Sequence, residues 1–412
     1  MDLDLVIVGG GPAGVSTALF LAAAAPELAG RIAVLEKERY PREKICAGAI
    51  GSRADKLLAT IGVRVEVPGV PIHGLSVATP FGARRSHDPD RTAPIGRVVR
   101  RVEFDRALAD EARARGIAIH DGVRVLGVEV GPGGARLQTS RGEIRTRALV
   151  GADGVGSLVR RAIGAPRGRF LAQVVEVDTP ARPDELPRDL LHFDLTDRGL
   201  AGYAWDFPTV VSGEALVCRG LYELRLDREG ERAPTSQGTI DLGARLEARL
   251  AALGLEARGL RIKRFAERGL ALHEPFARPS VILVGEAAGI DPVLGEGIPQ
   301  AIGYGAAAGA YLARCLTAGD LSFAGWPRAL LRSRVGLDLR IRSRLPGIVY
   351  GAPRPIIERW LTETTDLAIA GMRYLAGERV PRRRLVGAAR DAGIAILGEL
   401  TSSLPRPREP WR

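Results

Sequence analysis

Three glycine-rich segments, spread over most of the chain, constrain its fold more than any other feature. They are residues 9–14 (Gly-Gly-Gly-Pro-Ala-Gly), residues 151–157 (Gly-Ala-Asp-Gly-Val-Gly-Ser) and residues 285–298, which begin Gly-Glu-Ala-Ala-Gly and end Gly-Glu-Gly-Ile. The first segment alone is typical of a dinucleotide site. All three in this order indicate a long dinucleotide threaded through the molecule, with phosphates at one end and a flavin ring at the other. We therefore expect FAD.

The first segment has the surroundings that a phosphate site needs. Residues 3–8 are a short apolar run typical of a buried parallel strand, and an apolar helix follows the glycines. Gly9, Gly11 and Gly14 have the G-x-G-x-x-G spacing, which permits a tight turn and close approach to a pyrophosphate at the helix N-terminus. A second apolar run, residues 31–35, ends at Glu36, where an acid is expected to bind a ribose hydroxyl.

Length and cysteine content are those of an intracellular enzyme. A chain of 412 residues is expected to form two or three domains. It has no run of about eighteen uncharged apolar residues, so no transmembrane helix is expected. The glycine motif begins at residue 9, which leaves no room for a signal peptide. Cys46, Cys218 and Cys315 are few and far apart, which favours the cytoplasm and argues against a metal site.

The net charge of +11 comes almost entirely from arginine. The arginines are densest in residues 332–344 and 382–384. A solvated helix face is the favoured interpretation of this region, and peripheral contact with an acidic lipid surface is the alternative. No nucleic-acid motif accompanies the charge, so no nucleic-acid partner is expected.

The fold expected is α/β, with a Rossmann-like FAD-binding domain, an inserted α+β substrate domain with an antiparallel sheet, and a C-terminal helical region. Helices are expected over residues 104–115 and 240–253, and strands over residues 200–207 and 216–224. From residue 323 the pattern predicts helices, interrupted at Pro346, Pro353 and Pro355, and the sequence ends in a polar, proline-bearing tail. The expected boundaries are 1–67, 98–165 and 268–322 for the FAD-binding domain, 68–97 and 166–267 for the substrate domain, and 323–412 for the C-terminal region and tail.

Taken together, these segments resemble flavoproteins of the para-hydroxybenzoate hydroxylase fold, and within them the geranylgeranyl reductase group. Residues 101–108 match the R-x-x-F-D-x-x-L element, whose arginine lies near the flavin in that family. Position 286 is Glu where the family usually has Asp. The cofactor-binding residues that the motifs and the resemblance imply are Gly9, Gly11, Pro12, Ala13, Gly14, Glu36, Lys37, Cys46, Ala47, Arg101, Val125, Asp153, Gly154, Gly285, Glu286, Pro292, Gly295, Glu296, Gly297 and Ile298.

Residues 203–208 reproduce the Y-x-W-x-F-P signature of geranylgeranyl reductases. On a strand, Tyr203, Trp205 and Phe207 point to the same face. Tyr203 and Trp205 are expected either in an apolar wall over the flavin or in ordinary core, and Phe207 is expected in the core. Such a wall suits a long hydrocarbon or an aromatic ring.

Residues 40–48 resemble the P-R-x-K-x-C-G-G segment of the same reductases, with Ala47 in place of one glycine. In that family the cysteine lies near the reacting face of the flavin, so Cys46 is expected either to donate a proton or to shape the pocket. Arg42 and Lys44 are expected to lower its pKa. The alternative is a small buried residue in a tight loop.

The activity that the resemblance implies is hydride transfer from reduced flavin to a carbon–carbon double bond of a hydrophobic, isoprenoid or polyene-like substrate. Cys46, Tyr203 and Trp205 are the expected catalytic residues, with Cys46 and Tyr203 as proton donors, and NAD(P)H or a ferredoxin is the expected electron donor. The alternative is an aromatic or secondary-metabolite monooxygenase that uses oxygen and NAD(P)H. The W-x-W-x-I-P signature of flavin-dependent halogenases is absent from the sequence. A flavin-binding protein without activity is the third interpretation.

Overall fold

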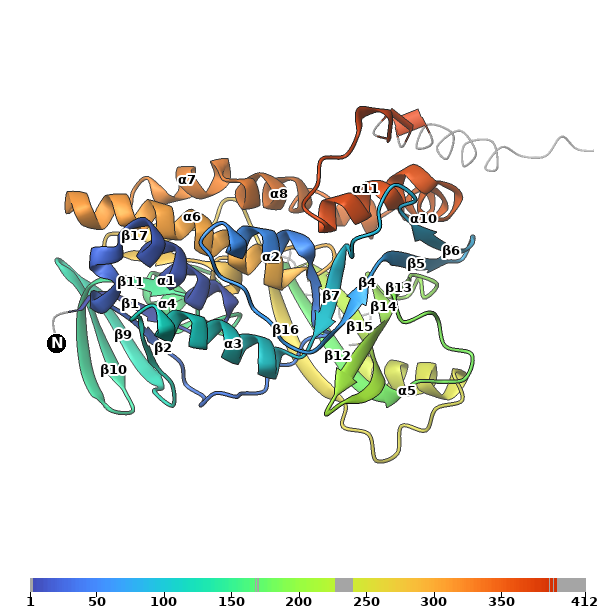
Figure 1. The fold of residues 1–412 in the computed structure, drawn as a ribbon, viewed down its shortest axis with the longest axis horizontal. Coiled ribbons are helices and arrows are strands. Elements are labelled where there is room, and N and C mark those ends of the chain that lie inside the picture. Colours follow the sequence, from blue (N-terminus) through green and yellow to red (C-terminus); the bar gives the residue numbers. More distant parts are fainter. Residues whose placement is uncertain are drawn as a thin grey trace, which may run out of the picture.

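The computed structural model describes residues 3–166, 168, 170–226, 240–384, 386, 387, 389 and 390. The polar, proline-bearing tail expected at the C-terminus lies outside these residues. Two large sheets and a layer of helices make up the described part (Figure 1).

The first sheet carries the strand–helix–strand unit expected from the sequence. β1 pairs in parallel with β2 on one side and β11 on the other, and α1 follows β1 directly. Pro12 occupies the first turn of α1, where its missing N–H leaves no bond unmade. The elements of this sheet and the helices around it are β1 (Leu3–Val8), α1 (Pro12–Ala24), η1 (Pro26–Arg31), β2 (Ile32–Leu35), α3 (Arg101–Ala114), β8 (Ala118–His120), β9 (Val125–Gly131), β10 (Gly134–Thr139), β11 (Gly142–Gly151), α4 (Leu158–Ala162), β17 (Ala277–Arg278), β18 (Val281–Leu283) and η2 (Gly285–Ala287).

The long helix α6 (Gly297–Ala318) packs closely on α1. Two glycines make this approach possible: a Cβ on Gly305 would overlap the Ser16 side chain, and one on Gly309 would lie 2.6 Å from the Leu21 nitrogen. The N-termini of α1 and α6 both border the cavity described below, so this packing fixes two of the three glycine-rich segments relative to each other.

The second sheet is antiparallel except for its β5–β13 pair, which is parallel. Its faces alternate as expected: Tyr203, Trp205 and Phe207 of β14 belong to the core on one face, and Ala204 packs on the other with the leucines of α5. The strands, in spatial order, and the helix on them are β16 (Lys263–Gly269), β12 (Phe170–Pro180), β15 (Glu214–Leu226), β14 (Gly202–Val211), β13 (Leu190–Asp194), β5 (Gly74–Thr79), β6 (Gly82–His87) and α5 (Leu242–Ala252).

A small three-stranded sheet and the C-terminal helices connect the two large sheets. α8 lies beside α6, while α10 and α11 cover β5 and β6 (Figure 1). In the described residues, none of the helices is long and apolar enough to cross a membrane. These elements are β3 (Ala49–Gly51), α2 (Ser52–Ala59), β4 (Gly69–Ile72), β7 (Gly96–Val99), α7 (Trp326–Arg332), α8 (Arg334–Arg342), α9 (Pro346–Val349), α10 (Arg354–Glu363) and α11 (Thr365–Leu375).

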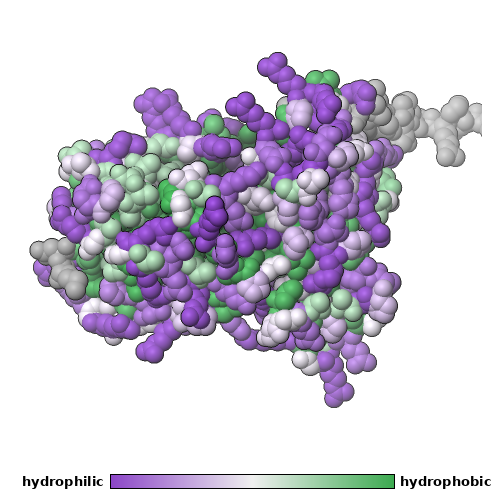
Figure 2. Space-filling view, in the orientation of Figure 1, coloured by the Kyte–Doolittle hydropathy of each residue, from purple (hydrophilic) through white to green (hydrophobic). Residues whose placement is uncertain are grey.

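The arginine-rich C-terminal region is only partly the solvated face that was expected. Arg332, Arg334 and Arg344 are exposed, and the face of the molecule in Figure 2 is largely hydrophilic. For Arg342 the expectation is wrong, because its guanidinium is largely buried and pairs with Asp291, with Glu296 at 3.2 Å and with Asp338 at 3.1 Å. This arginine therefore joins α8 to the loop before α6.

Candidate functional site

A cavity of about 1,310 Å³ runs from the first glycine-rich segment to the second sheet. This is larger than the roughly 300–1,000 Å³ typical of a site for one small ligand, so it has room for a dinucleotide and a substrate. Most of the residues expected to bind or react line it: Gly9, Gly11, Pro12, Ala13, Glu36, Lys37, Cys46, Ala47, Arg101, Val125, Asp153, Gly154, Tyr203, Trp205, Glu286, Gly295, Glu296, Gly297 and Ile298.

Gly14, Gly285 and Pro292 are not among the described residues that line the cavity. The two glycines allow close packing behind it. A Cβ on Gly14 would overlap the carbonyl oxygen of Gly9, and one on Gly285 (φ 57°) would lie 2.5 Å from the Cβ of Ala13. The backbone carbonyl of Pro292 accepts a hydrogen bond from Tyr222 at 3.2 Å.

Glu36 is held rigidly at the end of β2. Its carboxylate accepts backbone N–H groups of Gly10 and Glu38, both at 3.0 Å, and pairs with Arg42 at 3.2 Å. Among the described residues no side chain caps the N-terminus of α1, so the first-turn N–H groups remain for an anion. An acid beside a helix N-terminus is the arrangement that holds ribose and pyrophosphate in a dinucleotide site.

Asp153, in the second glycine-rich segment, mainly caps a helix. Its carboxylate accepts the N–H groups of Leu158 at 2.7 Å and Val159 at 3.2 Å, and the Ser157 hydroxyl. Burial raises its pKa, and these hydrogen bonds oppose the change. The segment crosses directly over the first one, since a Cβ on Gly9 would overlap the carbonyl of Ala152.

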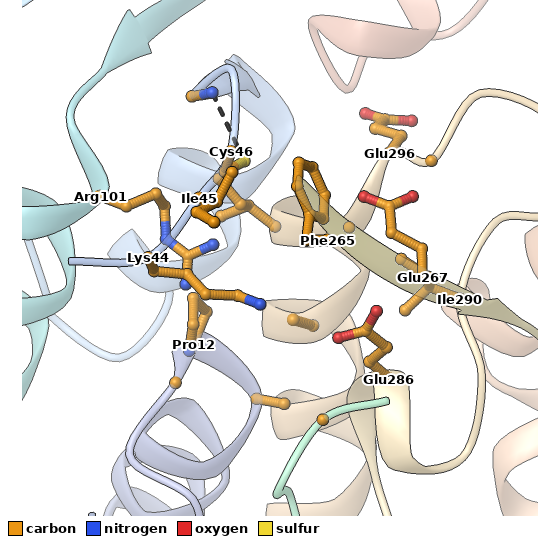
Figure 3. Close-up of a pocket in the computed structure, with 18 of the residues that line it drawn as sticks. Pro12, Lys44, Ile45, Cys46, Arg101, Phe265, Glu267, Glu286, Ile290 and Glu296 are labelled. Atoms are coloured by element: carbon orange, nitrogen blue, oxygen red, sulfur yellow. Dashed lines mark hydrogen bonds between the residues drawn. The ribbon is translucent and has the colours of Figure 1, made fainter. Parts of the chain in front are cut away.

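Cys46 lines the cavity beside Lys44 and Arg101 (Figure 3). Its Sγ accepts the N–H of Gly48 at 3.4 Å, and its own N–H donates to Glu176 at 3.1 Å. Gly48 holds the left-handed conformation of this loop (φ 80°), which explains why alanine is tolerated at position 47.

The prediction that Arg42 and Lys44 would lower the pKa of Cys46 is wrong. Burial raises the pKa of this thiol, and the cation that opposes the change is Arg101. Arg42 instead pairs with Glu36 and with Asp105, the latter at 3.0 Å. Asp105 also holds Arg101, at 2.7 Å.

Carboxylates from the third segment face Cys46 across the cavity. Figure 3 shows Glu286 and Glu296 on the side opposite Lys44 and Arg101. Burial raises the pKa of Glu286, opposed by the positive charge of Lys44. Glu296 is ion-paired with Arg53 at 2.6 Å and with Arg342 at 3.2 Å.

The aromatic wall expected from the Y-x-W-x-F-P signature is present and lines the cavity. Tyr203 stacks on Tyr222 of the next strand, with ring centroids 5.3 Å apart at 17°. Phe207, expected in ordinary core, also reaches the cavity and packs edge-on against Phe193 at 5.3 Å. The Tyr203 hydroxyl donates to the backbone carbonyl of Leu294, in the loop before α6.

Sequence reasoning missed several cavity residues that belong to no family motif. Phe265 and Glu267 come from β16, and Tyr374 comes from α11. The alternation of β16 places Phe265 and Glu267 on one face, but the sequence gives no sign that this face meets the cavity. Tyr374 lies between two guanidinium groups, with Arg53 4.1 Å and Arg342 4.9 Å from its ring centre.

Residues 2–322 match the family described as "FAD binding domain". The chain belongs to this family. It is therefore an FAD-dependent oxidoreductase, and the expectations of FAD and of an enzyme are confirmed. The free N–H groups at α1, the fixed acid at β2 and the long cavity all fit this cofactor.

Relatives support the resemblance to geranylgeranyl reductases. The chain is 28% identical over 371 residues to a digeranylgeranylglycerophospholipid reductase of Methanothrix thermoacetophila, covering 84% of this chain and 86% of the relative. It is 27% identical over 221 residues to the uncharacterized protein Mbar_A1602 of Methanosarcina barkeri, covering 53% of each chain. The match thus spans about half the length of this second relative.

Solved structures confirm the α/β flavoprotein fold. A geranylgeranyl bacteriochlorophyll reductase-like protein of Thermoplasma acidophilum superposes with a TM-score of 0.66 at 18% identity, covering 97% of this chain and 99% of the other. The flavin-dependent brominase Bmp2 gives a TM-score of 0.68 at 17% identity, covering 97% of this chain and all of the other. At these identities the likeness shows the fold alone.

Proposed function

We propose that the protein is a flavin-dependent reductase of carbon–carbon double bonds in a hydrophobic, isoprenoid or polyene-like substrate. The observation that carries the proposal is the aromatic wall of Tyr203, Trp205 and Phe207, which lines a cavity that also contains the nucleotide-binding glycines. Flat apolar side chains suit an extended hydrocarbon. The relatives named for reducing digeranylgeranylglycerophospholipid support the same substrate class.

In this proposal one end of the cavity binds the nucleotide part of FAD and the other end binds the flavin and the substrate. Gly9, Gly11 and the N-terminus of α1 bind the pyrophosphate, and Glu36 binds a ribose. Glu286 and residues 295–298 hold the flavin end. When bound, FAD supplies the two-electron redox chemistry, as a hydride donor in its reduced form. The aromatic wall orients the alkene and excludes water.

Cys46 and Tyr203 are the proton donors expected from the sequence, and their surroundings in the structure differ. Cys46 is a neutral thiol, because burial raises its pKa. The proton of the Tyr203 hydroxyl is directed to the carbonyl of Leu294. Trp205, next to Tyr203 at a centroid distance of 6.2 Å, is assigned to substrate contact.

The runner-up is an oxygen-dependent hydroxylase, because aklavinone-11 hydroxylase shares the fold. The reductase is favoured by the relatives that align over most of this chain. Incubating the protein with NAD(P)H, a geranylgeranyl compound and no oxygen separates the two. A product two hydrogens heavier per double bond supports the reductase, and a product formed only in air and heavier by one oxygen contradicts it.

Electron donor, compartment and membrane contact belong to the same proposal. NAD(P)H or a ferredoxin reduces the flavin, and the free thiols Cys46, Cys218 and Cys315 fit the cytoplasm.

Peripheral contact with an acidic lipid surface would bring the protein to a lipid-borne substrate. It is supported by Leu337 and Ile341 of α8, which are 48% and 62% exposed, and by the neighbouring exposed arginines. Sedimentation with phosphatidylserine vesicles, but not with phosphatidylcholine vesicles, tests this contact.

A further inference from the structure

Glu267 is an acid inside the cavity that no motif pointed to. It lies on β16, two residues after Phe265 and on the same face, and its carboxyl group points into the cavity between Glu286 and Glu296 (Figure 3). The carboxyl group also packs against the loop before α6, since a Cβ on Gly295 would overlap its Oε2. The same Cβ would lie 3.1 Å from Tyr222, so Glu267 and Tyr222, which stacks on Tyr203 of the aromatic wall, both pack against Gly295.

Glu267 differs from Glu36 and Glu296 in having no hydrogen-bond or ion-pair partner within the described part of the chain. Among the described residues its Oε2 is enclosed and has no hydrogen-bond donor. Glu36 has two N–H donors and an arginine, and Glu296 has two arginines. An oxygen enclosed without a donor disfavours the charged carboxylate, so this environment favours the protonated form of Glu267.

The charges that face Glu267 act in the same direction. Burial raises its pKa well above the ordinary value, and Glu286 on η2, Asp291 before α6 and Glu176 on β12 raise it further when they are ionised. Lys44, in the loop that carries Cys46, is the cation that opposes them. Burial and these charges thus favour the protonated carboxyl group, and one cation is placed to stabilise the carboxylate that forms when the proton leaves.

We propose that Glu267 is the acid that protonates the substrate in the reduction. The assignment rests on the proposed function, in which reduced flavin is the reductant. One alkene carbon receives the hydride and the other receives the carboxyl proton. The O–H bond of Glu267, the π bond and the bond that holds the hydride in the reduced flavin break, two C–H bonds form, and the flavin is oxidised by two electrons. Glu267 is left as a carboxylate and regains a proton from water.

Two other candidates fit this role less well. The Tyr203 proton is already donated to Leu294, and burial raises the pKa of Tyr203 well above its ordinary value. The Cys46 thiol also has a raised pKa and accepts a hydrogen bond from Gly48. Both groups then shape the site, while the carboxyl group of Glu267 supplies the proton.

The test compares wild type with Glu267→Gln, which keeps the shape and removes the acidic proton, and with Glu247→Gln on the exposed side of α5 as a control. FAD content and the visible flavin spectrum report whether each variant is folded and loaded. Infrared difference spectra between the oxidised and the reduced protein report the C=O stretch of a protonated carboxyl group directly, and they need no turnover. We expect its carbonyl band in wild type and Glu247→Gln and its loss in Glu267→Gln.

In an anaerobic single turnover, dithionite-reduced protein is mixed with a geranylgeranyl compound and reoxidation of the flavin is followed against pH. We expect the rate in wild type to decline at high pH, and we expect Glu267→Gln to be slower by roughly 10²-fold or more, as for loss of a general acid, and to lack that decline. Unchanged rate and pH profile in Glu267→Gln would overturn the role of Glu267 and leave the proposed function standing. If the geranylgeranyl compound fails to reoxidise the reduced FAD in the wild-type protein, the proposed function itself is overturned.

Discussion

The hydroxyl of Tyr203 donates a hydrogen bond to the backbone carbonyl of Leu294, so the aromatic wall is tied directly to the loop before α6. Two more tyrosines bind the same loop: Tyr222 donates to Pro292 and Tyr350 donates to Val293. Three successive carbonyls are therefore held by β14, β15 and the residue that follows α9. The loop expected to face the flavin is positioned by the substrate sheet and by the C-terminal helices together.

Tyr203→Phe and Tyr350→Phe are expected to behave alike. Each removes one hydrogen bond to the loop, which lowers the free energy of unfolding by about 1 kcal/mol and weakens FAD binding to a similar extent. Urea unfolding and FAD titration measure both effects. Tyr350 is not among the described residues that line the cavity, so it serves as the matched control. A rate of alkene reduction that collapses only in Tyr203→Phe would show instead that this hydroxyl reacts.

Gly295→Ala is expected to damage the site more than a comparable glycine substitution elsewhere. A Cβ on Gly295 (φ 64°) would overlap Oε2 of Glu267 and lie 3.1 Å from the ring of Tyr222, so the Glu267 side chain has to shift to make room for it. Gly62 has nearly the same backbone (φ 69°) with nothing within 4 Å, so Gly62→Ala isolates backbone strain, about 1–2 kcal/mol. Urea unfolding should show a larger loss for Gly295→Ala. Equal losses would contradict the packing described for Glu267.

Glu176 is expected to make stability depend on pH. Burial raises its pKa from 4.5 to about 7, so its neutral form is favoured in the folded protein. Its contribution is fully present below pH 4.5 and is lost as pH rises through about 7, a change of roughly 3 kcal/mol. Glu176→Gln stays neutral, so wild type should lose stability relative to this variant between pH 5 and pH 8. A stability difference that does not vary over that range, measured by urea unfolding, would rule out this ionisation.

Arg342→Met is expected to destabilise the protein by roughly 3–5 kcal/mol, because it leaves Asp291 and Glu296 without this buried partner. Arg344, two residues away and exposed, is the control, and Arg344→Met should change stability by less than about 0.5 kcal/mol. Thermal or urea unfolding of both variants measures the difference. Similar effects in the two variants would mean that the network does not hold the loop.

The sequence predicted the parts of the fold that repeat a local pattern. The apolar runs 3–8 and 31–35 are β1 and β2, and the alternation around Tyr203 places three aromatic rings on one face of β14. Gly9 and Gly14 mark real close approaches of backbone to backbone. The domain boundaries and the roles given to the individual site residues stay predictions.

What the sequence could not predict depends on packing between distant segments. Tyr350 and Arg342 reach the loop before α6 from the C-terminal helices, and no local period reveals such contacts. Glu267 looks like an ordinary polar residue of a strand, and only the arrangement of β16 over the cavity makes it a buried acid. The prediction for the pKa of Cys46 was wrong because burial of the thiol, which raises its pKa, depends on distant segments, as does the position of Arg101, the cation that opposes the change.

The measurement that tests the central claim most directly is anaerobic reoxidation of the reduced flavin by an isoprenoid alkene. Purified protein carrying FAD is reduced with dithionite, mixed with a geranylgeranyl compound without oxygen, and followed by flavin absorbance and product mass. We predict reoxidation together with a product heavier by two hydrogens for each reduced double bond. A flavin that stays reduced until air is admitted, and then yields an oxygenated product, would contradict the reductase and establish the hydroxylase.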